Sequence, residues 1–350
     1  MKFEKENKKV KRLIITCLTA IIIIGLQTSL SYSQQVKLAQ TGFNFLSISS
    51  DARAGAMGDA VTTIPDYYTG ALSHNPASMG DMKSLLNANV SVNNWIADIK
   101  YLSCDAVIAP FSGNYGVIGL SFQSVNYGDV QGTMVANNSK GYIETDIMKP
   151  TAMALGIGYS KMISEQFGVG AQVRFAYQAL GTSVVPDYTT NTVGTKKNVA
   201  KTTAFDFGTI FKTGIKSIAF GMSVRNFSQD IKFEEEEFQL PLLFSVGLSA
   251  NVFDFFDMKG PEQSLILSCD LTHPRSHPEQ LKIGAEYQFM KLIALRGGYI
   301  SGDDEDGVTF GVGVTSSGLG LSTANFAIDY SYTPFGVFDK VQRFTVSFSM

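Results

Sequence analysis

Few side chains of this sequence are grouped as a catalytic or metal-binding site requires. The one cluster with metal-ligand character is the segment 273–277, which holds two of the three histidines and lies near Asp270 and Glu279. Prolines at 274 and 278 prevent the two histidines from sharing one face of a helix. We therefore interpret the segment as a loop that binds no metal.

Other chemical signatures are also missing. The acidic runs 234–237 and 303–306 lack the spaced oxygen ligands of a dedicated calcium loop, and we interpret both as solvated loops. The sequence has no serine-nucleophile motif, phosphate-binding glycine loop or zinc-protease motif. We predict a protein that is not an enzyme and has no catalytic residue, cofactor or metal.

Composition narrows the class of protein further. Hydrophobic residues make up 45% of the 350-residue chain, which excludes a disordered protein. The formal net charge of −3 provides no basic surface, so nucleic acid is not an expected partner. Three cysteines are too few for a disulfide scaffold. Cys104 and Cys269 fall within predicted strands, and the sequence neither requires nor excludes a bridge between them.

The first 33 residues have the pattern of a secretory signal peptide. Lysines and an arginine crowd residues 1–12, an apolar run covers 13–26, and Ser31-Tyr32-Ser33 supplies a small-x-small cleavage pattern. The alternative is a transmembrane anchor, but the run is shorter than the ~20 residues that a span needs. We predict a signal peptide over 1–33 that is cleaved on export.

Strict alternation of apolar and polar residues governs the chain from about residue 84 onward. In 169–178 and 281–289, for example, every second residue is apolar, and the polar face is small, glycine-rich and sparsely charged with both signs. This pattern suits a wide barrel with one face toward lipid and the other toward a lumen. We predict an all-β transmembrane antiparallel β-barrel of about 14 strands over 84–350, with strands at 84–95, 98–110, 114–127, 149–162, 166–180, 200–212, 216–228, 239–253, 263–272, 280–289, 292–300, 307–316, 323–333 and 340–350.

Connections of unequal length support this prediction. One alternate set contains the long loops 128–148 and 181–199, whereas the other set consists mostly of tight turns, as in bacterial outer-membrane barrels. Strands in lipid must also close on each other, because each unpaired backbone group costs several kcal/mol there. We expect binding to use the two long loops, through Tyr142, Tyr188 and the pair Val184-Val185.

A barrel of this width encloses space that something must fill. Residues 34–83 lack sustained alternation and are predicted to form an N-terminal hatch or plug. Charges of mixed sign on the inward face favour pairing around such a plug over an ion-selective pore. The predicted lumen charges are Arg174, Asp206, Lys212, Arg225, Asp270, Lys282, Glu286, Arg296, Asp329 and Arg343.

The segments 45–60 and 74–79 resemble the opening of the PorV/PorQ family, which belongs to the FadL-like outer-membrane barrels of Bacteroidetes-type bacteria. Segments 284–287 and 295–299 are also similar to this family. This chain departs from the family's pattern at His74, where an aromatic residue is common, and at its last residues, Phe348-Ser349-Met350. The hatch motif consists of Asp51, Arg53, Gly55, Met57, Gly58, Asn75, Pro76 and Ala77, and the last three form either a hinge or a plain turn.

The resemblance implies a location in the outer membrane and a role in the type IX secretion system. A protein of this kind holds or shuttles secreted cargo, through the cargo's C-terminal sorting domain, between the translocon and the surface-attachment machinery. Its partners would be outer-membrane lipid, translocon and attachment-complex proteins, and those sorting domains. The alternative is FadL-like transport of hydrophobic small molecules.

Overall fold

The computed structural model describes residues 41–187, 192–233, 236–256, 262–302, 307–319, 324–338 and 340–350. The predicted signal peptide and the start of the predicted hatch lie outside these residues, as does Tyr188. No helix among the described residues has the length and apolar character needed to cross a membrane.

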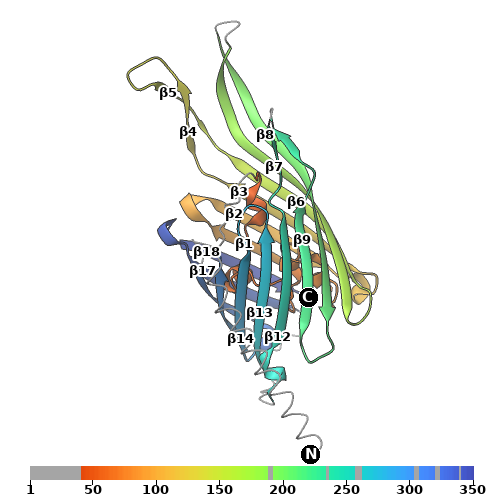
Figure 1. Ribbon diagram of the computed structural model, residues 1–350. Helices are drawn as coiled ribbons and strands as arrows, with labels where there is room; N and C mark the ends of the chain where they lie inside the picture. The colour runs from red at the N-terminus through yellow and green to blue at the C-terminus, as the bar shows by residue number, and fades with distance from the viewer. Residues whose placement is uncertain are drawn as a thin grey trace, which may run out of the picture. The chain divides into compact units, whose positions relative to one another are not determined.

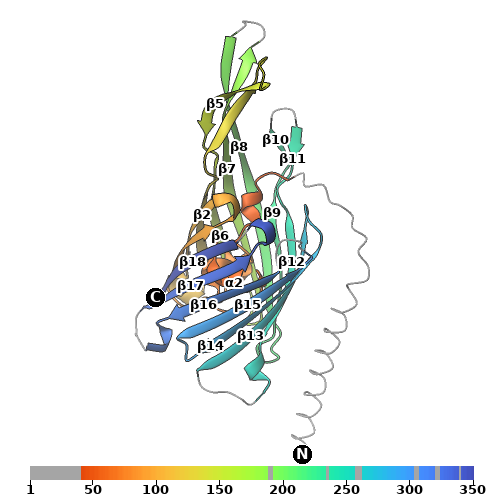
Figure 2. The same ribbon diagram turned by 90° about the vertical axis from the view of Figure 1, so that its left-hand side faces the viewer.

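Fourteen antiparallel strands form a closed barrel, as predicted, and every predicted range overlaps one of them. The first strand pairs with the last, and Val90 lies opposite Val346 in that register. Figures 1 and 2 show the strands wrapped around a common interior. The barrel strands are β1 (Leu86–Asn94), β2 (Lys100–Ile108), β3 (Val117–Asn126), β6 (Thr151–Met162), β7 (Phe167–Asp187), β8 (Thr192–Lys212), β9 (Ala219–Phe227), β12 (Leu243–Asn251), β13 (Gln263–Pro274), β14 (Gln280–Phe289), β15 (Ile293–Ser301), β16 (Val308–Thr315), β17 (Asn325–Pro334) and β18 (Lys340–Ser349).

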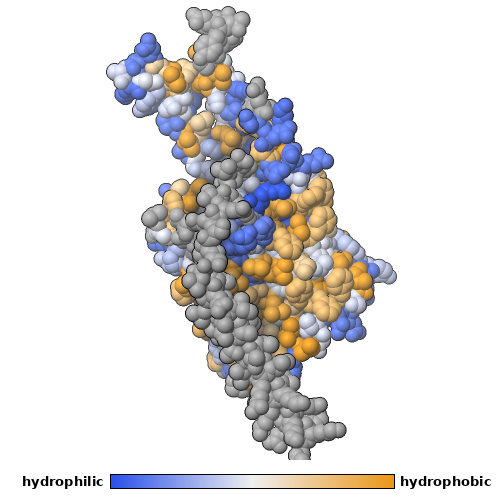
Figure 3. Space-filling model, in the orientation of Figure 1, coloured by the Kyte–Doolittle hydropathy of each residue, from blue (hydrophilic) through white to orange (hydrophobic). Residues whose placement is uncertain are grey.

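The barrel carries its large apolar side chains on the outside. On β6, Met153, Leu155 and Ile157 are exposed, whereas the alternating residues Ala152 and Ala154 are buried. Figure 3 shows apolar residues gathered over the barrel wall and more polar residues over the hairpins above it. A soluble protein buries such residues, so this inverted pattern indicates a wall that faces lipid.

Two of the predicted long loops are folded differently from the prediction. The connection 128–148 contains the hairpin β4 (Val130–Val135) and β5 (Tyr142–Met148). The predicted loop 181–199 is wrong, because β7 and β8 stay paired beyond a bulge after Ala179, with residues 181–187 opposite residues 192–198. β-Branched residues such as Val184 and Val185 favour this extension. Both hairpins project past the barrel (Figures 1 and 2).

Smaller elements complete the connections. β10 (Ile231–Phe233) pairs with β11 (Glu236–Phe238). Strand β13 continues through Pro274, so His273 ends a strand instead of lying in the predicted loop. Its Nδ1 lies 2.8 Å from Glu279 Oε1. Short 3-10 turns cover η4 (Ile96–Asp98), η5 (Pro110–Gly113), η6 (Val252–Asp254), η7 (Ser317–Leu319) and η8 (Gly336–Phe338).

Residues 41–83, which we call the N-terminal segment, run through the barrel interior. Four short elements shape it: η2 (Asn44–Ser47), α2 (Ala52–Ala56), α3 (Tyr68–Ala71) and η3 (Pro76–Met79). The wall glycines let it approach closely, since a Cβ on Gly298 would lie 2.3 Å from Gly58 N, and one on Gly170 2.4 Å from Pro76 C. The small, glycine-rich side chains that the sequence places on the inward face of the strands therefore leave room for this segment.

Candidate functional site

The lumen beside the N-terminal segment has an apolar end and a polar end. At the hairpin end, Phe43, Phe45 and Leu46 are at most 2% exposed and pack with Tyr101 and Leu240. Phe43 also stacks on Phe238, with ring centroids 6.0 Å apart. The segment thus closes this end of the lumen with its own aromatic side chains.

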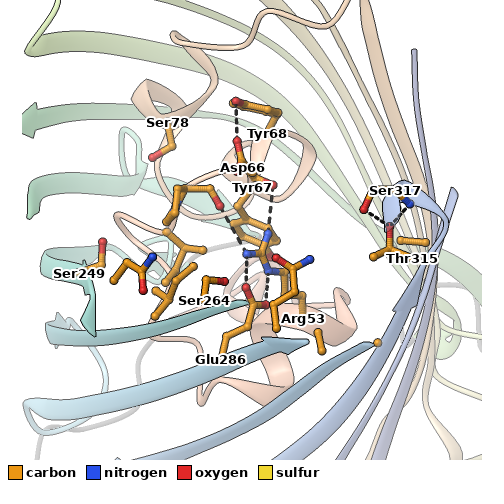
Figure 4. Close-up of a pocket in the computed structure, with 18 of the residues that line it drawn as sticks. Arg53, Asp66, Tyr67, Tyr68, Ser78, Ser249, Ser264, Glu286, Thr315 and Ser317 are labelled. Atoms are coloured by element: carbon orange, nitrogen blue, oxygen red, sulfur yellow. Dashed lines mark hydrogen bonds and ion pairs between the residues drawn. The ribbon is translucent and has the colours of Figure 1, made fainter. Parts of the chain in front are cut away.

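The opposite end contains a cavity of about 820 Å³. It lies between the N-terminal segment and the short-turn ends of the strands, and Figure 4 shows part of its lining. Charged and hydroxyl-bearing side chains dominate that lining, including Asp66, Tyr68, Lys216, Asp254 and Lys291. A polar vestibule therefore faces the side of the barrel that carries the short turns.

An ion-pair chain of four residues joins the segment to the wall beside this cavity. Arg53 Nη2 lies 2.7 Å from Glu286 Oε1, and its Nε donates to Glu286 Oε2 at 2.8 Å. Arg296 contacts Glu286 at 2.5 Å and Asp329 at 2.6 Å. Glu286 and Arg296 are direct cross-strand partners on β14 and β15. Figure 4 shows Arg53 and Glu286 pointing toward one another.

The electrostatics of the ion-pair chain favour its charged form. Burial alone disfavours a charged Arg53, but the adjacent Glu286 outweighs burial and raises the pKa of Arg53 above its ordinary value. Arg53 Nη1 also donates to the carbonyl of Asp66 at 3.0 Å. Because two nitrogens of its guanidinium bind the two oxygens of Glu286, Arg53 fixes both the position and the orientation of α2 against the wall.

A second charged group occupies the wall between β7 and β9. Arg174 Nε lies 2.7 Å from Asp206 Oδ2, and Arg174 Nη2 donates to Asn226 Oδ1 at 2.5 Å. Asn226 has a φ of 59° beside a register shift between β8 and β9, and its N–H donates to Asp206 Oδ1. The bulge therefore gives Asp206 a backbone hydrogen bond in addition to its ion pair with Arg174.

Four of the remaining predicted lumen charges hold the N-terminal segment directly. The backbone N–H of Thr62 donates to Asp270 Oδ2 at 2.9 Å. Arg225 donates to the carbonyl of Leu46, Arg343 to that of Ser49, and Lys212 pairs with Asp81, while Lys282 is half-buried on β14.

The hatch-motif residues account for the local geometry of the segment. Asp51 caps α2 by accepting from the N–H of Ala54, and Asn75 caps η3 by accepting from the N–H of Ala77. Pro76 occupies the first position of η3, where its missing N–H costs nothing. Gly58 has a φ of 61°, which glycine adopts without strain.

Close packing explains the rest of the motif. A Cβ on Gly55 would lie 2.7 Å from Arg343 Cδ, and Met57 is fully buried. Asn75 also donates to the carbonyl of Thr209 in β8, so residues 75–77 form a capped turn against the wall. The alternative that residues 75–77 act as a hinge stays a prediction.

Sequence reasoning missed two site residues, Tyr67 and Asp105. The hydroxyl of Tyr67 donates to Asp51 Oδ1 at 2.8 Å, and Asp105 lines the lumen from β2. Burial, followed by the charge of Asp51, raises the pKa of Tyr67 well above its ordinary value, so Tyr67 stays protonated. The alternation of β2 places Asp105 inward, which was the available signal.

A closed barrel with an apolar exterior and an internal N-terminal segment defines the class of bacterial outer-membrane barrels. No protein-family model and no curated protein sequence matches this chain. Solved structures do match it.

The toluene transporter TbuX of Ralstonia pickettii aligns with a TM-score of 0.56 at 12% identity, covering 85% of this chain and 96% of that one. The Pseudomonas putida toluene transporter TodX gives 0.56 at 12%, covering 89% and 99%. A Pseudomonas aeruginosa FadL homologue gives 0.54 at 11%, covering 86% and 98%. The fold is therefore that of FadL-type barrels, and two of these three matched proteins are toluene transporters.

Proposed function

We propose that this chain is an outer-membrane channel that admits hydrophobic small molecules. The observation that carries the proposal is the order of features along the lumen. An apolar cluster built on Phe43 and Phe45 lies at the hairpin end, and a cavity of about 820 Å³ lies at the short-turn end. The N-terminal segment stands between them. The toluene transporters with the same fold support a monoaromatic hydrocarbon as the first substrate to test.

In this proposal the N-terminal segment is the hatch. Among the described residues its backbone pairs with no barrel strand, and its one isolated bridge, between Thr41 and Gln239, lies outside the named strands. Side chains supply most other polar links to the wall, such as Arg53 to Glu286 and Thr309 Oγ1 to the carbonyl of Ala56. Such links break and re-form without unpairing any barrel strand. Displacing α2 would connect the apolar end to the polar vestibule.

Uptake of radiolabelled toluene tests this function. The chain is expressed in a host strain that lacks its own hydrophobic-molecule channels, and uptake is compared with that of the empty host. We expect faster uptake with the chain present. The matched control is Lys149→Ala, which removes a solvent-exposed ion pair with Asp129. Uptake equal to the empty host for toluene and larger hydrophobes would reject the proposal.

The second candidate is a component of the type IX secretion system, located in the outer membrane of a Bacteroidetes-type cell after cleavage of a signal peptide. The N-terminal motif favours it, and so do the projecting hairpins. These expose Val135 at 89%, Ile147 at 55% and Val193 at 60%, which suits a protein-binding surface. Its partners would be translocon and attachment-complex proteins and the sorting domains of cargo.

Removing the β4–β5 hairpin separates the two candidates. A variant with a short turn in place of 130–148 keeps the barrel and the lumen. Lost secretion of proteins with C-terminal sorting domains, with unchanged toluene uptake, would favour the secretion role. Unchanged secretion after deletion of the whole gene would reject that role.

A further inference from the structure

The outward face of strands β18, β1 and β2 ends in polar side chains at the hairpin end of the barrel. Asn94 lies opposite Gln342 on one side and opposite Lys100 on the other, so these three residues form one row across three strands. Lys340 lies two residues beyond Gln342 and therefore on the same face of β18. Asn94, Lys100 and Lys340 are exposed, and Gln342 is half-buried. We call these four residues the outer polar group.

The same face is apolar immediately beside this group, in the direction of the short turns. The next row consists of Phe344, Val92 and Leu102, and all three side chains are exposed. The exposed pair Val346 and Val90 continues the apolar surface one row further. Large exposed apolar side chains on a barrel wall face the acyl chains of the membrane. The outer polar group therefore lies at the level where acyl chains end and lipid headgroups begin.

The opposite half of the wall ends differently at the hairpin side, which in outer-membrane barrels faces the cell exterior. On β13 the exposed His273 pairs with Glu279, which compensates that carboxylate. The hairpin ends of β9, β12, β15 and β16 expose Phe227, Phe244, Tyr299 and Val308. Among the described residues, those four strands thus end in apolar side chains instead of a row of lysine and amides.

No described neighbour compensates the two lysines of the outer polar group. Neither Lys100 nor Lys340 has a hydrogen bond or ion pair within the described part of the chain. The exposed Asp98 precedes Lys100 by two residues and forms no ion pair with it. Lys149, which is also exposed at the hairpin side, differs because it pairs with Asp129. The outer polar group therefore presents two positive charges to the headgroup layer.

We propose that the outer polar group binds the phosphorylated sugar headgroup of one lipopolysaccharide molecule. Lysine binds phosphate as a point charge, and side-chain amides form hydrogen bonds with sugar hydroxyls. Gln342 donates to the hydroxyl of Tyr330 at 2.9 Å, which leaves its carbonyl oxygen as an acceptor. The strand spacing and the rise per residue place the Cα atoms of Lys100 and Lys340 roughly 12 Å apart. Two cations that flank two amides match a sugar with phosphates better than the single phosphate of a phospholipid.

The apolar rows would contact the acyl chains of the same lipid. Its position is on the seam that closes the barrel, because β1 is the first barrel strand and β18 the last. A lipid that contacts both strands would stabilise their pairing. This inference depends on the outer-membrane location of the barrel and not on the proposed channel function.

Binding of defined lipids to the delipidated full chain in detergent micelles tests the site. The probes are lipid A with two phosphates, the same lipid with both phosphates removed, and phosphatidylglycerol, all in EDTA so that divalent ions do not bridge phosphates. We expect native mass spectrometry to retain one bisphosphorylated lipid A per barrel and much less of the other two lipids. Lys100→Gln and Lys340→Gln should each weaken binding about fivefold, and the double variant more than tenfold.

The matched control is Lys140→Gln, which removes an exposed lysine from the turn between β4 and β5 and should bind as wild type. All these variants replace exposed side chains, so each is expected to fold. Bisphosphorylated lipid A should also raise the thermal unfolding midpoint of the wild type and the control more than that of the double variant.

Three results would overturn the proposal. The first is a wild-type chain that retains no lipid A. The second is equal binding of bisphosphorylated lipid A by the wild type and by the double variant Lys100→Gln with Lys340→Gln. The third is wild-type binding of phosphatidylglycerol or of the dephosphorylated lipid as tight as that of bisphosphorylated lipid A, which would show that the wall contacts lipid without selecting this headgroup.

Discussion

Arg53 in the N-terminal segment and Glu286 in the barrel wall form a bidentate ion pair, with Nη2 2.7 Å from Oε1 and Nε 2.8 Å from Oε2. Glu286 is also held by Arg296, its cross-strand partner. The wall therefore keeps this carboxylate in place whether or not the segment is docked. This arrangement makes Arg53 the movable member of the ion-pair chain.

Replacing Arg53 with Met should loosen the segment while leaving the barrel intact. We expect a loss of about 2–4 kcal/mol in the free energy of unfolding, because the buried Glu286 loses one of two cationic partners. Urea unfolding in detergent measures it. Lys149→Ala removes an exposed pair and should change the free energy by less than ~1 kcal/mol. Equal effects from both variants would contradict a role for Arg53 in docking.

Removing Asp206 should destabilise the wall more than removing the whole pair. Asp206→Ala leaves Arg174 buried with only Asn226, and we expect a cost of about 3–5 kcal/mol. The double variant Arg174→Met with Asp206→Leu should recover most of this cost, because no charge remains unpaired. A double variant that is worse than the single one would show that the pair itself stabilises the barrel.

A methyl group on Gly298 should displace the segment. Its Cβ would lie 2.3 Å from backbone atoms of Met57 and Gly58, far inside contact distance. We expect Gly298→Ala to cost about 1–3 kcal/mol and to increase protease cleavage within the segment. Gly307→Ala is the control, since nothing lies within 4 Å of its Cβ. Equal cleavage in the two variants would argue against close docking.

Alkaline pH should weaken the folded state through Tyr67. Burial and Asp51 raise the pKa of Tyr67 well above its ordinary value of 10.0. Since the unfolded chain then loses its proton first, the contribution of Tyr67 is complete below pH 10 and declines as pH rises toward the folded pKa. Comparing unfolding of wild type and Tyr67→Phe from pH 8 to 11 measures this. A parallel pH dependence in both proteins would contradict it.

Alternation along the sequence was enough to predict the barrel, its fourteen strands and the inward direction of residues such as Arg174 and Glu286. It works because a barrel wall between lipid and lumen repeats the same two environments at every second residue. The extension of β7 and β8 beyond the barrel was missed, because paired strands in water need no apolar face toward lipid. Cys104 and Cys269 are free thiols on β2 and β13, so no bridge forms.

The site was predicted less completely. Its charged residues were placed in the lumen, but their pairing was not, because Arg53 and Glu286 are separated by 233 residues in sequence. Tyr67 was missed because the segment has no periodicity from which a facing direction can be read. Asp105 alternates correctly on β2, yet its lack of a partner appears only when the opposing segment is in place.

Toluene uptake by Arg53→Met, set beside the wild-type chain and the Lys149→Ala control at equal amounts of folded barrel, tests the central claim most directly. If the N-terminal segment is the hatch of a hydrophobic channel, the wild-type and control chains should exceed the empty host, and Arg53→Met should exceed both severalfold. Uptake by Arg53→Met that stays at the level of the empty host would show that the lumen is not a path for such molecules.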